Sequence, residues 1–299
     1  MPKCKVEKEF ERKRAADIIK AVQAQNYSLS ICEWGCRAFV SVTGIAMQNQ
    51  NTDSMADFLD DGGCEALIEI MNKYVAISEK IASYACLTIC ILSWSLRDMK
   101  EFLGEIGACE LAVFATSMHI GDPLVSEYGS GAIGLLAKEN ISNSLRLAES
   151  GACDVISQVA NFGFALRQEN ACDVATNVCF AFAQLSEAQN ASQLLDCGAP
   201  ALVVQLMKVH IENKDFLPAA VKAICALSSL NGKHREEIGR VGGCELLVQV
   251  INLSSLEVCV IQEGCEAIMH VIHISNPFIH KNRFIYLIII LHSVVSESK

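Results

Sequence analysis

The sequence has few of the residues that proteins use to bind charged ligands or to stack bases. Aromatic residues make up 6% and charged residues 19% of its 299 residues, and it has only five prolines. A formal charge of −10 argues against a nucleic-acid partner, because binding to phosphate backbones needs clustered Lys and Arg. The remainder is 52% apolar and dominated by Ala, Leu, Ile and Val, which favours a large helical core.

Motifs of the common enzyme classes are also missing. The sequence has no Gly-x-Ser-x-Gly elbow, no His-Glu-x-x-His pair and no P-loop lysine. Residues 129–134 match the dinucleotide-binding pattern G-x-G-x-x-G, but no strand precedes them. The repeat register described below places these glycines inside a helix, where they indicate close packing. We therefore predict neither an enzyme nor a bound cofactor.

Fifteen cysteines are the most unusual feature of the composition. Their number is odd, no Cys-x-x-Cys pair occurs, and the first residues contain no apolar stretch typical of a secretory signal. We expect free thiols in the cytoplasm, with the nucleus as an alternative location. His270 and His273 lie close to Cys265 and Glu266, but local spacing does not complete a ligand set, so we predict no metal.

A glycine-led tripeptide recurs along the chain and indicates an internal repeat. The intervals between its first residues are 45, 44, 47 and 44 residues. A short amphipathic stretch precedes each copy, and two longer apolar helical patterns follow it. The five copies are Gly62-Gly63-Cys64, Gly107-Ala108-Cys109, Gly151-Ala152-Cys153, Gly198-Ala199-Pro200 and Gly242-Gly243-Cys244.

With three helices per unit and a Gly-Ala or Gly-Gly turn after the first, the chain resembles the armadillo repeat family. HEAT repeats are the near alternative, but they usually have two helices and a different turn. The resemblance implies an all-α fold, a right-handed superhelical α-solenoid of three-helix repeats. It indicates a partial unit at about 15–50 and five further units at 51–95, 96–139, 140–186, 187–230 and 231–275. Recurring cysteines then substitute for alanine in closely packed positions.

In armadillo proteins the third helices line a concave surface that binds peptides or helices. The nuclear import adaptors of the family carry a Trp and, four residues later, an Asn in most third helices, and none of the six units here carries that pair. One turn before the Trp position, Trp34, Tyr84 and Tyr128 form a candidate aromatic ladder. The full set of candidate groove residues is Trp34, Arg37, Tyr84, Tyr128, Asn177, Gln184, Lys222 and Glu263.

The resemblance implies a scaffold without enzymatic activity that binds a protein partner along the third helices. A transport adaptor of the importin-alpha type is the alternative, weakened by the missing Trp/Asn pairs. We expect an array over 15–275 flanked by two different ends. Residues 1–14 begin a basic segment, since residues 3–20 hold seven basic and four acidic side chains. This segment either caps the array or binds a partner.

Residues 276–299 contain an apolar run at 284–295. It is shorter than the roughly 20 residues that a membrane helix needs, so we predict no membrane span. Three interpretations remain open for this run: packing on the last repeat, contact with a second chain, or the start of a further, truncated repeat.

Overall fold

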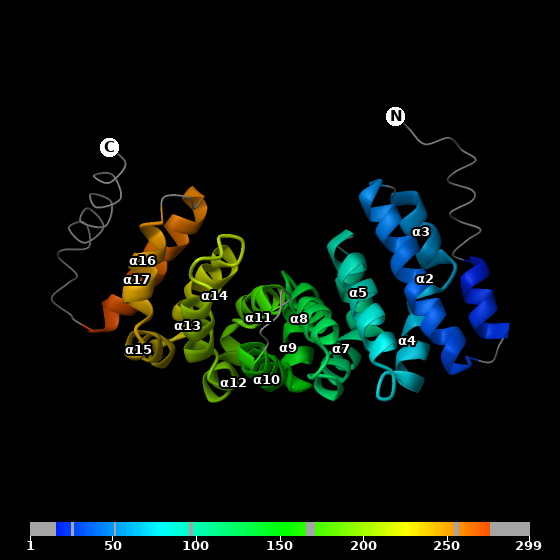
Figure 1. Ribbon diagram of the computed structural model, residues 1–299, viewed down its shortest axis with the longest axis horizontal. Helices are drawn as coiled ribbons and strands as arrows, with labels where there is room; N and C mark the ends of the chain where they lie inside the picture. The colour runs from blue at the N-terminus through cyan, green and yellow to red at the C-terminus, as the bar shows by residue number, and fades with distance from the viewer. Residues whose placement is uncertain are drawn as a thin grey trace. The chain divides into compact units, whose positions relative to one another are not determined.

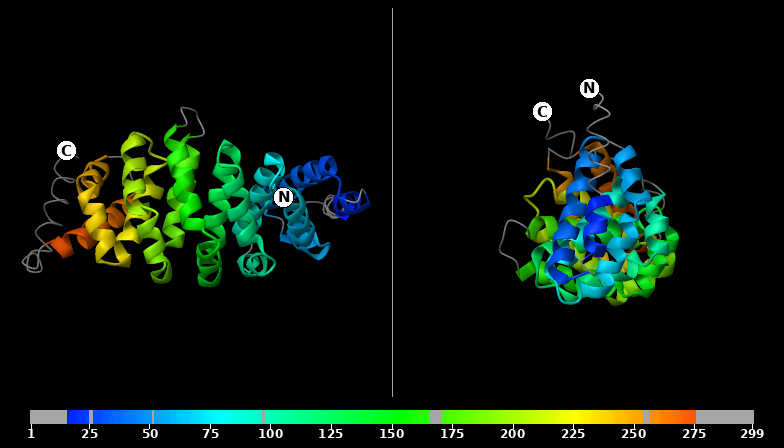
Figure 2. Two further views of the ribbon diagram at one scale, coloured as in Figure 1. Left: turned by 90° about the horizontal axis from the view of Figure 1, so that it is seen from below. Right: turned by 90° about the vertical axis from the view of Figure 1, so that its right-hand side faces the viewer.

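The computed structural model describes residues 16–24, 27–50, 52–95, 98–165, 171–253 and 257–275. Within these ranges the backbone forms helices and short turns, without strands (Figures 1 and 2). The chain divides into two compact units, unit 1 at 1–152 and unit 2 at 153–299. No helix of the described ranges is both long and apolar enough to cross a membrane. The predicted arm at 1–14 and the tail at 276–299 lie outside the described residues and stay predictions.

The described part of unit 1 consists of three-helix repeats. A helical segment at 16–24 and α2 (Leu29–Gln48) precede the first complete repeat. That repeat has α3 (Thr52–Asp60), α4 (Gly63–Tyr74) and α5 (Glu79–Ser95). The next has α6 (Met99–Glu105), α7 (Ala108–Met118) and α8 (Pro123–Ala137), and α9 (Ile141–Glu149) begins another. The third helices of unit 1 are therefore α2, α5 and α8.

Unit 2 repeats the pattern. It opens with α10 (Ala152–Ala165) and α11 (Ala171–Leu185). Then come η1 (Ala188–Asn190), α12 (Ala191–Asp196), α13 (Ala199–Val209) and α14 (Leu217–Leu230). The last described repeat has α15 (Gly232–Arg240), α16 (Gly243–Ile251) and α17 (Val258–Ser275). The third helices of unit 2 are therefore α11, α14 and α17.

A left-handed glycine stands between the first and second helices of every repeat. Its φ lies between 77° and 94° at Gly62, Gly107, Gly151, Gly198 and Gly242. In this region the Cβ of an L-residue approaches the following carbonyl oxygen, so glycine is favoured. The recurring glycine found in the sequence is therefore a requirement of the backbone, and the predicted glycine turn is confirmed.

The cores of the repeats are apolar and closely packed. Phe39 of α2 and Phe58 of α3 are fully buried, with their ring centroids 5.3 Å apart in an edge-on arrangement. The cysteines that follow the turn glycines point inward: Cys64 and Cys109 are 0% exposed, and burial is the main cause that raises the pKa of each to about 12. The packing role predicted for the recurring cysteines is confirmed at these two positions.

The glycines of the G-x-G-x-x-G pattern lie inside α8, as the repeat register predicts. A Cβ at Gly129 would clash with the side chain of Thr116 on α7, so glycine allows these two helices to approach closely. The helix begins before this segment, at Pro123, and its N-cap is Asp122, whose carboxylate accepts a hydrogen bond from the N–H of Val125 at 2.8 Å. The pattern is therefore a helix-packing feature.

A buried asparagine connects the first helix of a repeat to the preceding third helix. Asn143 donates its amide to the carbonyls of Leu136 at 3.2 Å and Lys100 at 2.6 Å, and Asn190 donates to Leu185 at 3.0 Å. Carbonyls in the last turn of a helix lack intrahelical partners. These amides satisfy such carbonyls near the ends of α8 and α11, so two of the first helices are connected to the preceding third helix in this way.

Candidate partner-binding surface

The candidate surface of unit 1 lies on three neighbouring third helices. α5 packs against α2 on one side and against α8 on the other. The Cys90 thiol of α5 donates to the carbonyl of Tyr128 on α8, with Sγ and O 3.4 Å apart. We call the set Trp34, Arg37, Tyr84, Leu87, Trp94 and Tyr128 the third-helix face of unit 1.

Exposure distinguishes the rows of residues along these helices. Trp34 is 50% exposed, and Tyr84 and Tyr128 are half-buried, so the candidate ladder has no fully buried ring. In unit 1, the row of residues one turn further along the third helices contains buried Gly131. The row two turns further along contains buried Ile91. The aromatic row therefore offers side-chain surface on all three helices, and large rings are effective anchors for a partner.

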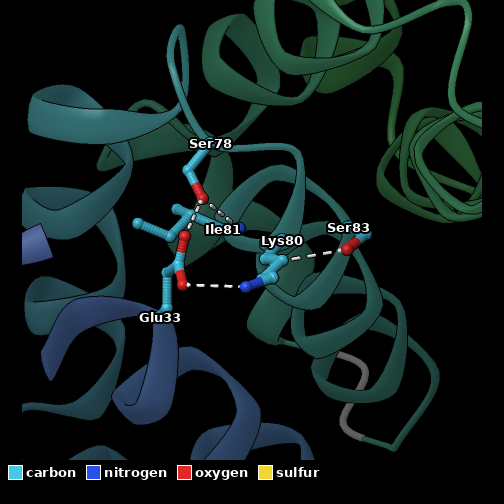
Figure 3. A network of polar contacts seen from close by, with 5 residues as sticks. All are labelled: Glu33, Ser78, Lys80, Ile81 and Ser83. Carbon is cyan, nitrogen blue, oxygen red and sulfur yellow. Dashed lines mark hydrogen bonds and ion pairs between the residues drawn. The ribbon is translucent and has the colours of Figure 1, made fainter. Parts of the chain in front are cut away.

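A polar network connects the start of α5 to Glu33 on α2 (Figure 3). The Glu33 carboxylate accepts a hydrogen bond from the Ser78 hydroxyl at 2.9 Å and pairs with the Lys80 ammonium at 3.3 Å. Ser78 Oγ in turn accepts from the N–H of Ile81, which caps the start of α5. Glu33 precedes Trp34 on α2, so the network orients the helix that carries this ring.

In unit 2, α14 packs against α11 and α17, and these helices carry the polar candidates. Asn177 and Gln184 of α11 are half-buried, Lys222 of α14 is exposed, and Glu263 of α17 is half-buried. Amide and charged side chains replace the rings of unit 1. We call these four residues the third-helix face of unit 2.

The electrostatics of unit 2 centre on the contact between α14 and α17. Burial, followed by the carboxylates of Glu266 and Glu263, raises the pKa of Cys225 to about 11. Ser228 Oγ lies 3.0 Å from His270 Nδ1, and Glu266 Oε1 lies 3.9 Å from His270 Nε2. This set is similar to a Ser-His-carboxylate triad, but Ser228 is 0% exposed and shares its hydroxyl with the Cys225 carbonyl. It therefore connects two helices and leaves no access for a substrate.

The sequence pattern considered for a metal site, His270 and His273 near Cys265 and Glu266, lies on α17. The described residues contain no group of three His, Cys, Asp or Glu side chains placed to hold a metal ion. His270 is bonded to Ser228 as above, and the side chain of His273 lies outside the described residues.

Comparison with known proteins places the fold. The sequence matches no family model and no curated protein. A designed armadillo repeat protein matches with a TM-score of 0.68 at 16% identity, over 86% of this chain and 99% of the designed one. Another, solved in complex with the peptide (KR)4, gives 0.65 at 16% identity over 86% and 98%. Computationally designed armadillo repeat proteins for modular peptide recognition give 0.67 at 16% over 85% and 98%.

The chain has the armadillo-repeat fold. The predicted all-α solenoid of three-helix repeats is thus confirmed, whereas its right-handed superhelical path stays a prediction. Armadillo repeats stack so that each third helix packs on its neighbours, as α2, α5 and α8 do in unit 1.

One exposed aromatic residue of the third-helix face of unit 1 was not predicted from the sequence. Trp94, near the end of α5, is 66% exposed, and the Lys138 ammonium lies 5.2 Å from its ring centroid. The signal was present, because Tyr84, Leu87, Ile91 and Trp94 follow three- and four-residue steps along one side of α5. The ring extends the aromatic surface toward the C-terminal end of that helix.

Proposed function

We propose that this armadillo protein is a scaffold without enzymatic activity that binds a protein partner on its third-helix faces. The observation that carries the proposal is the aromatic row of unit 1, in which Trp34 is half exposed and Tyr84 and Tyr128 are not fully buried. Solvent-accessible rings in consecutive repeats supply contact area with little side-chain entropy to lose. The free thiols of the described cysteines suit a cytoplasmic protein.

The two faces favour different parts of a partner. In unit 1 the rings together with Leu87 suit apolar side chains of a peptide or helix. In unit 2 the amides of Asn177 and Gln184 suit the hydrogen-bonding groups of an extended backbone. A similar designed armadillo protein was solved with a peptide, (KR)4, which supports peptide binding as the mode.

The transport adaptor remains the second candidate, and the same peptide makes it testable. Two observations weaken it. The third helices lack the Trp/Asn pairs of import adaptors, and the exposed ring of Trp94 already has the Lys138 ammonium over it. A cation of the same chain thus occupies one side of a ring that a basic peptide would use.

The test begins by selecting peptides from a random displayed library on the whole chain and measuring their affinity by titration calorimetry. We expect the combined substitution Trp34→Ala, Tyr84→Ala and Tyr128→Ala to weaken a selected peptide by roughly 30-fold or more, because aromatic anchors carry at least about 2 kcal/mol. Circular dichroism would check that this variant keeps its helices.

A matched control is available on α7. Phe114 and Met118 are 44% and 49% exposed, which is similar to the 50% exposure of Trp34, but they belong to the second helix of a repeat. Their replacement by Ala should leave the affinity unchanged. Equal affinity of the triple variant and the wild type would contradict the anchor assignment. Binding of (KR)4 that weakens steeply with added salt would instead favour the adaptor.

A further inference from the structure

The side of α17 that faces away from α14 is open, although the equivalent side of α14 is closed. On α14, Leu217, Ala220, Val221 and Ser228 are each 0% exposed. α17 covers this side: a Cβ at Gly264 would lie 3.6 Å from Val221 Cγ1, and His270 bonds Ser228.

Each of these four residues of α14 has an equivalent on α17, 41 positions later in the sequence, at the same place in the repeat. There, Val258 is 71% exposed, Met269 is 37% exposed, Gln262 is exposed and Ile261 is half-buried. The place of Ile261 is closed in the other third helices, with at most 1% exposure at Cys32, Ala82, Ser126, Ala175 and Ala220.

The second helix of the last repeat shows the same opening. The cysteine two residues after the turn glycine is at most 2% exposed at Cys64, Cys109 and Cys153, but Cys244 on α16 is half-buried. After burial, the next cause that raises the pKa of Cys153 is its electrostatic interaction with Cys197 of the following repeat, so this place lies toward the following repeat. We call Cys244, Val258, Ile261 and Met269 the end face.

We propose that residues 284–295 of this chain pack on the end face and close the last repeat. The segment reads Phe-Ile-Tyr-Leu-Ile-Ile-Ile-Leu-His-Ser-Val-Val, with two polar residues in twelve. As a helix it would measure about 18 Å, close to the roughly 21 Å of the 14-residue α14 that it would mimic. The eight residues at 276–283 can span up to about 26 Å, enough to return it to α17.

The end face and the segment fit each other chemically. Three of the four residues of the face are Val, Ile and Met, and the place of Ile261 is buried in the other third helices. The described ranges contain no repeat after α17, so no described helix covers this surface as α17 covers α14. A segment of the same chain, tethered a few residues away, reaches it at high effective concentration.

Cys244 allows the proposal to be tested on the whole chain. We would pulse the native protein with N-ethylmaleimide and quantify each cysteine by peptide mass spectrometry. The tail variant Ile288→Asp with Ile290→Asp is compared with the wild type and with a matched variant, Ser296→Asp with Ser298→Asp. The matched variant adds the same charge outside the apolar segment.

If the segment covers the end face, Cys244 reacts about tenfold faster in the Ile288/Ile290 variant than in the wild type or the matched variant, because thiol reactivity follows access. Cys225, half-buried between α14 and α17, keeps its rate, and fully buried Cys109 stays protected, which shows that the array is still folded. If Cys109 becomes reactive, the milder pair Ile288→Ser and Ile290→Ser replaces the aspartates.

Two results would overturn the proposal. One is an equal rate for Cys244 in all folded variants. The other is protection of Cys244 that appears only at concentrations where sedimentation detects a dimer, which would assign the end face to a second copy of the chain.

Discussion

Replacing the turn glycine Gly107 by alanine isolates the cost of a left-handed backbone. Gly107 has a φ of 94° between α6 and α7, and the nearest atom to an added Cβ is Glu110 Oε2 at 4.0 Å. The substitution therefore meets no steric obstacle outside its own backbone. Gly121 is the matched control in the same unit, because its added Cβ would meet nothing within 4 Å and its φ lies outside the left-handed region.

The expected magnitude follows from two opposing terms. An L-residue in the left-handed region costs roughly 1–2 kcal/mol. Gly→Ala also restricts the unfolded chain, which stabilises the folded state by about 0.4–1 kcal/mol. The free energy of unfolding of Gly107→Ala should thus fall by about 1 kcal/mol, whereas Gly121→Ala should leave it unchanged or raise it by up to about 1 kcal/mol.

Urea unfolding followed by circular dichroism measures the difference in the free energy of unfolding between the two variants. Both curves are fitted with the same dependence of that free energy on urea concentration. Gly107→Asn provides an internal check, since asparagine tolerates left-handed φ and should cost less than alanine. The reasoning is refuted if Gly107→Ala is as stable as Gly121→Ala, or if asparagine at position 107 is no better than alanine.

Three further predictions concern the core, the thiols and the histidines. Phe39→Ala should lower the free energy of unfolding by about 3–5 kcal/mol in urea titrations, because it empties a fully buried site; a loss below about 1 kcal/mol would contradict this packing. Iodoacetamide at pH 8 should modify exposed Cys259 and leave Cys86, whose pKa burial raises to about 12, unmodified in mass spectra of the native chain. Burial lowers the pKa of His234 and His270. Since the unfolded chain then binds more protons, the contribution of these histidines to stability is complete above the unfolded pKa of about 6.5 and is lost as the pH falls below it. In thermal melts, the melting temperature of His234→Gln should therefore fall less steeply with decreasing pH than that of the wild type.

The repeat architecture was predictable because one backbone requirement recurs. Glycine adopts a left-handed φ without steric cost, so a glycine recurs at nearly constant spacing, once at each turn between a first and a second helix. The register of the third helices followed from this spacing. The buried asparagines Asn143 and Asn190 escaped notice since the same place holds Met99 and His234 in two other repeats. Two occurrences are too few for a pattern search.

Exposure along the third helices was less predictable. α5 is apolar on nearly every side, so its hydrophobic pattern does not distinguish Ile91, which is 8% exposed, from Trp94, which is 66% exposed. That difference depends on neighbours distant in sequence, including Gly44 of α2, where an added Cβ would lie 3.8 Å from Ile91 Cδ1. Candidates at the centre of a third helix were therefore easier to identify than one at its end.

The chain contains only two tryptophans, and both belong to the third-helix face of unit 1. Trp34 and Trp94 are at least half exposed, so the indole fluorescence of the whole protein arises from water-accessible rings on this one surface. Emission should be red-shifted and readily quenched by acrylamide in the free protein. A ligand that covers the face would shift it to the blue, whereas a ligand bound to unit 2 would leave it unchanged. The protein thus carries its own optical reporter for the surface on which its function is proposed to depend.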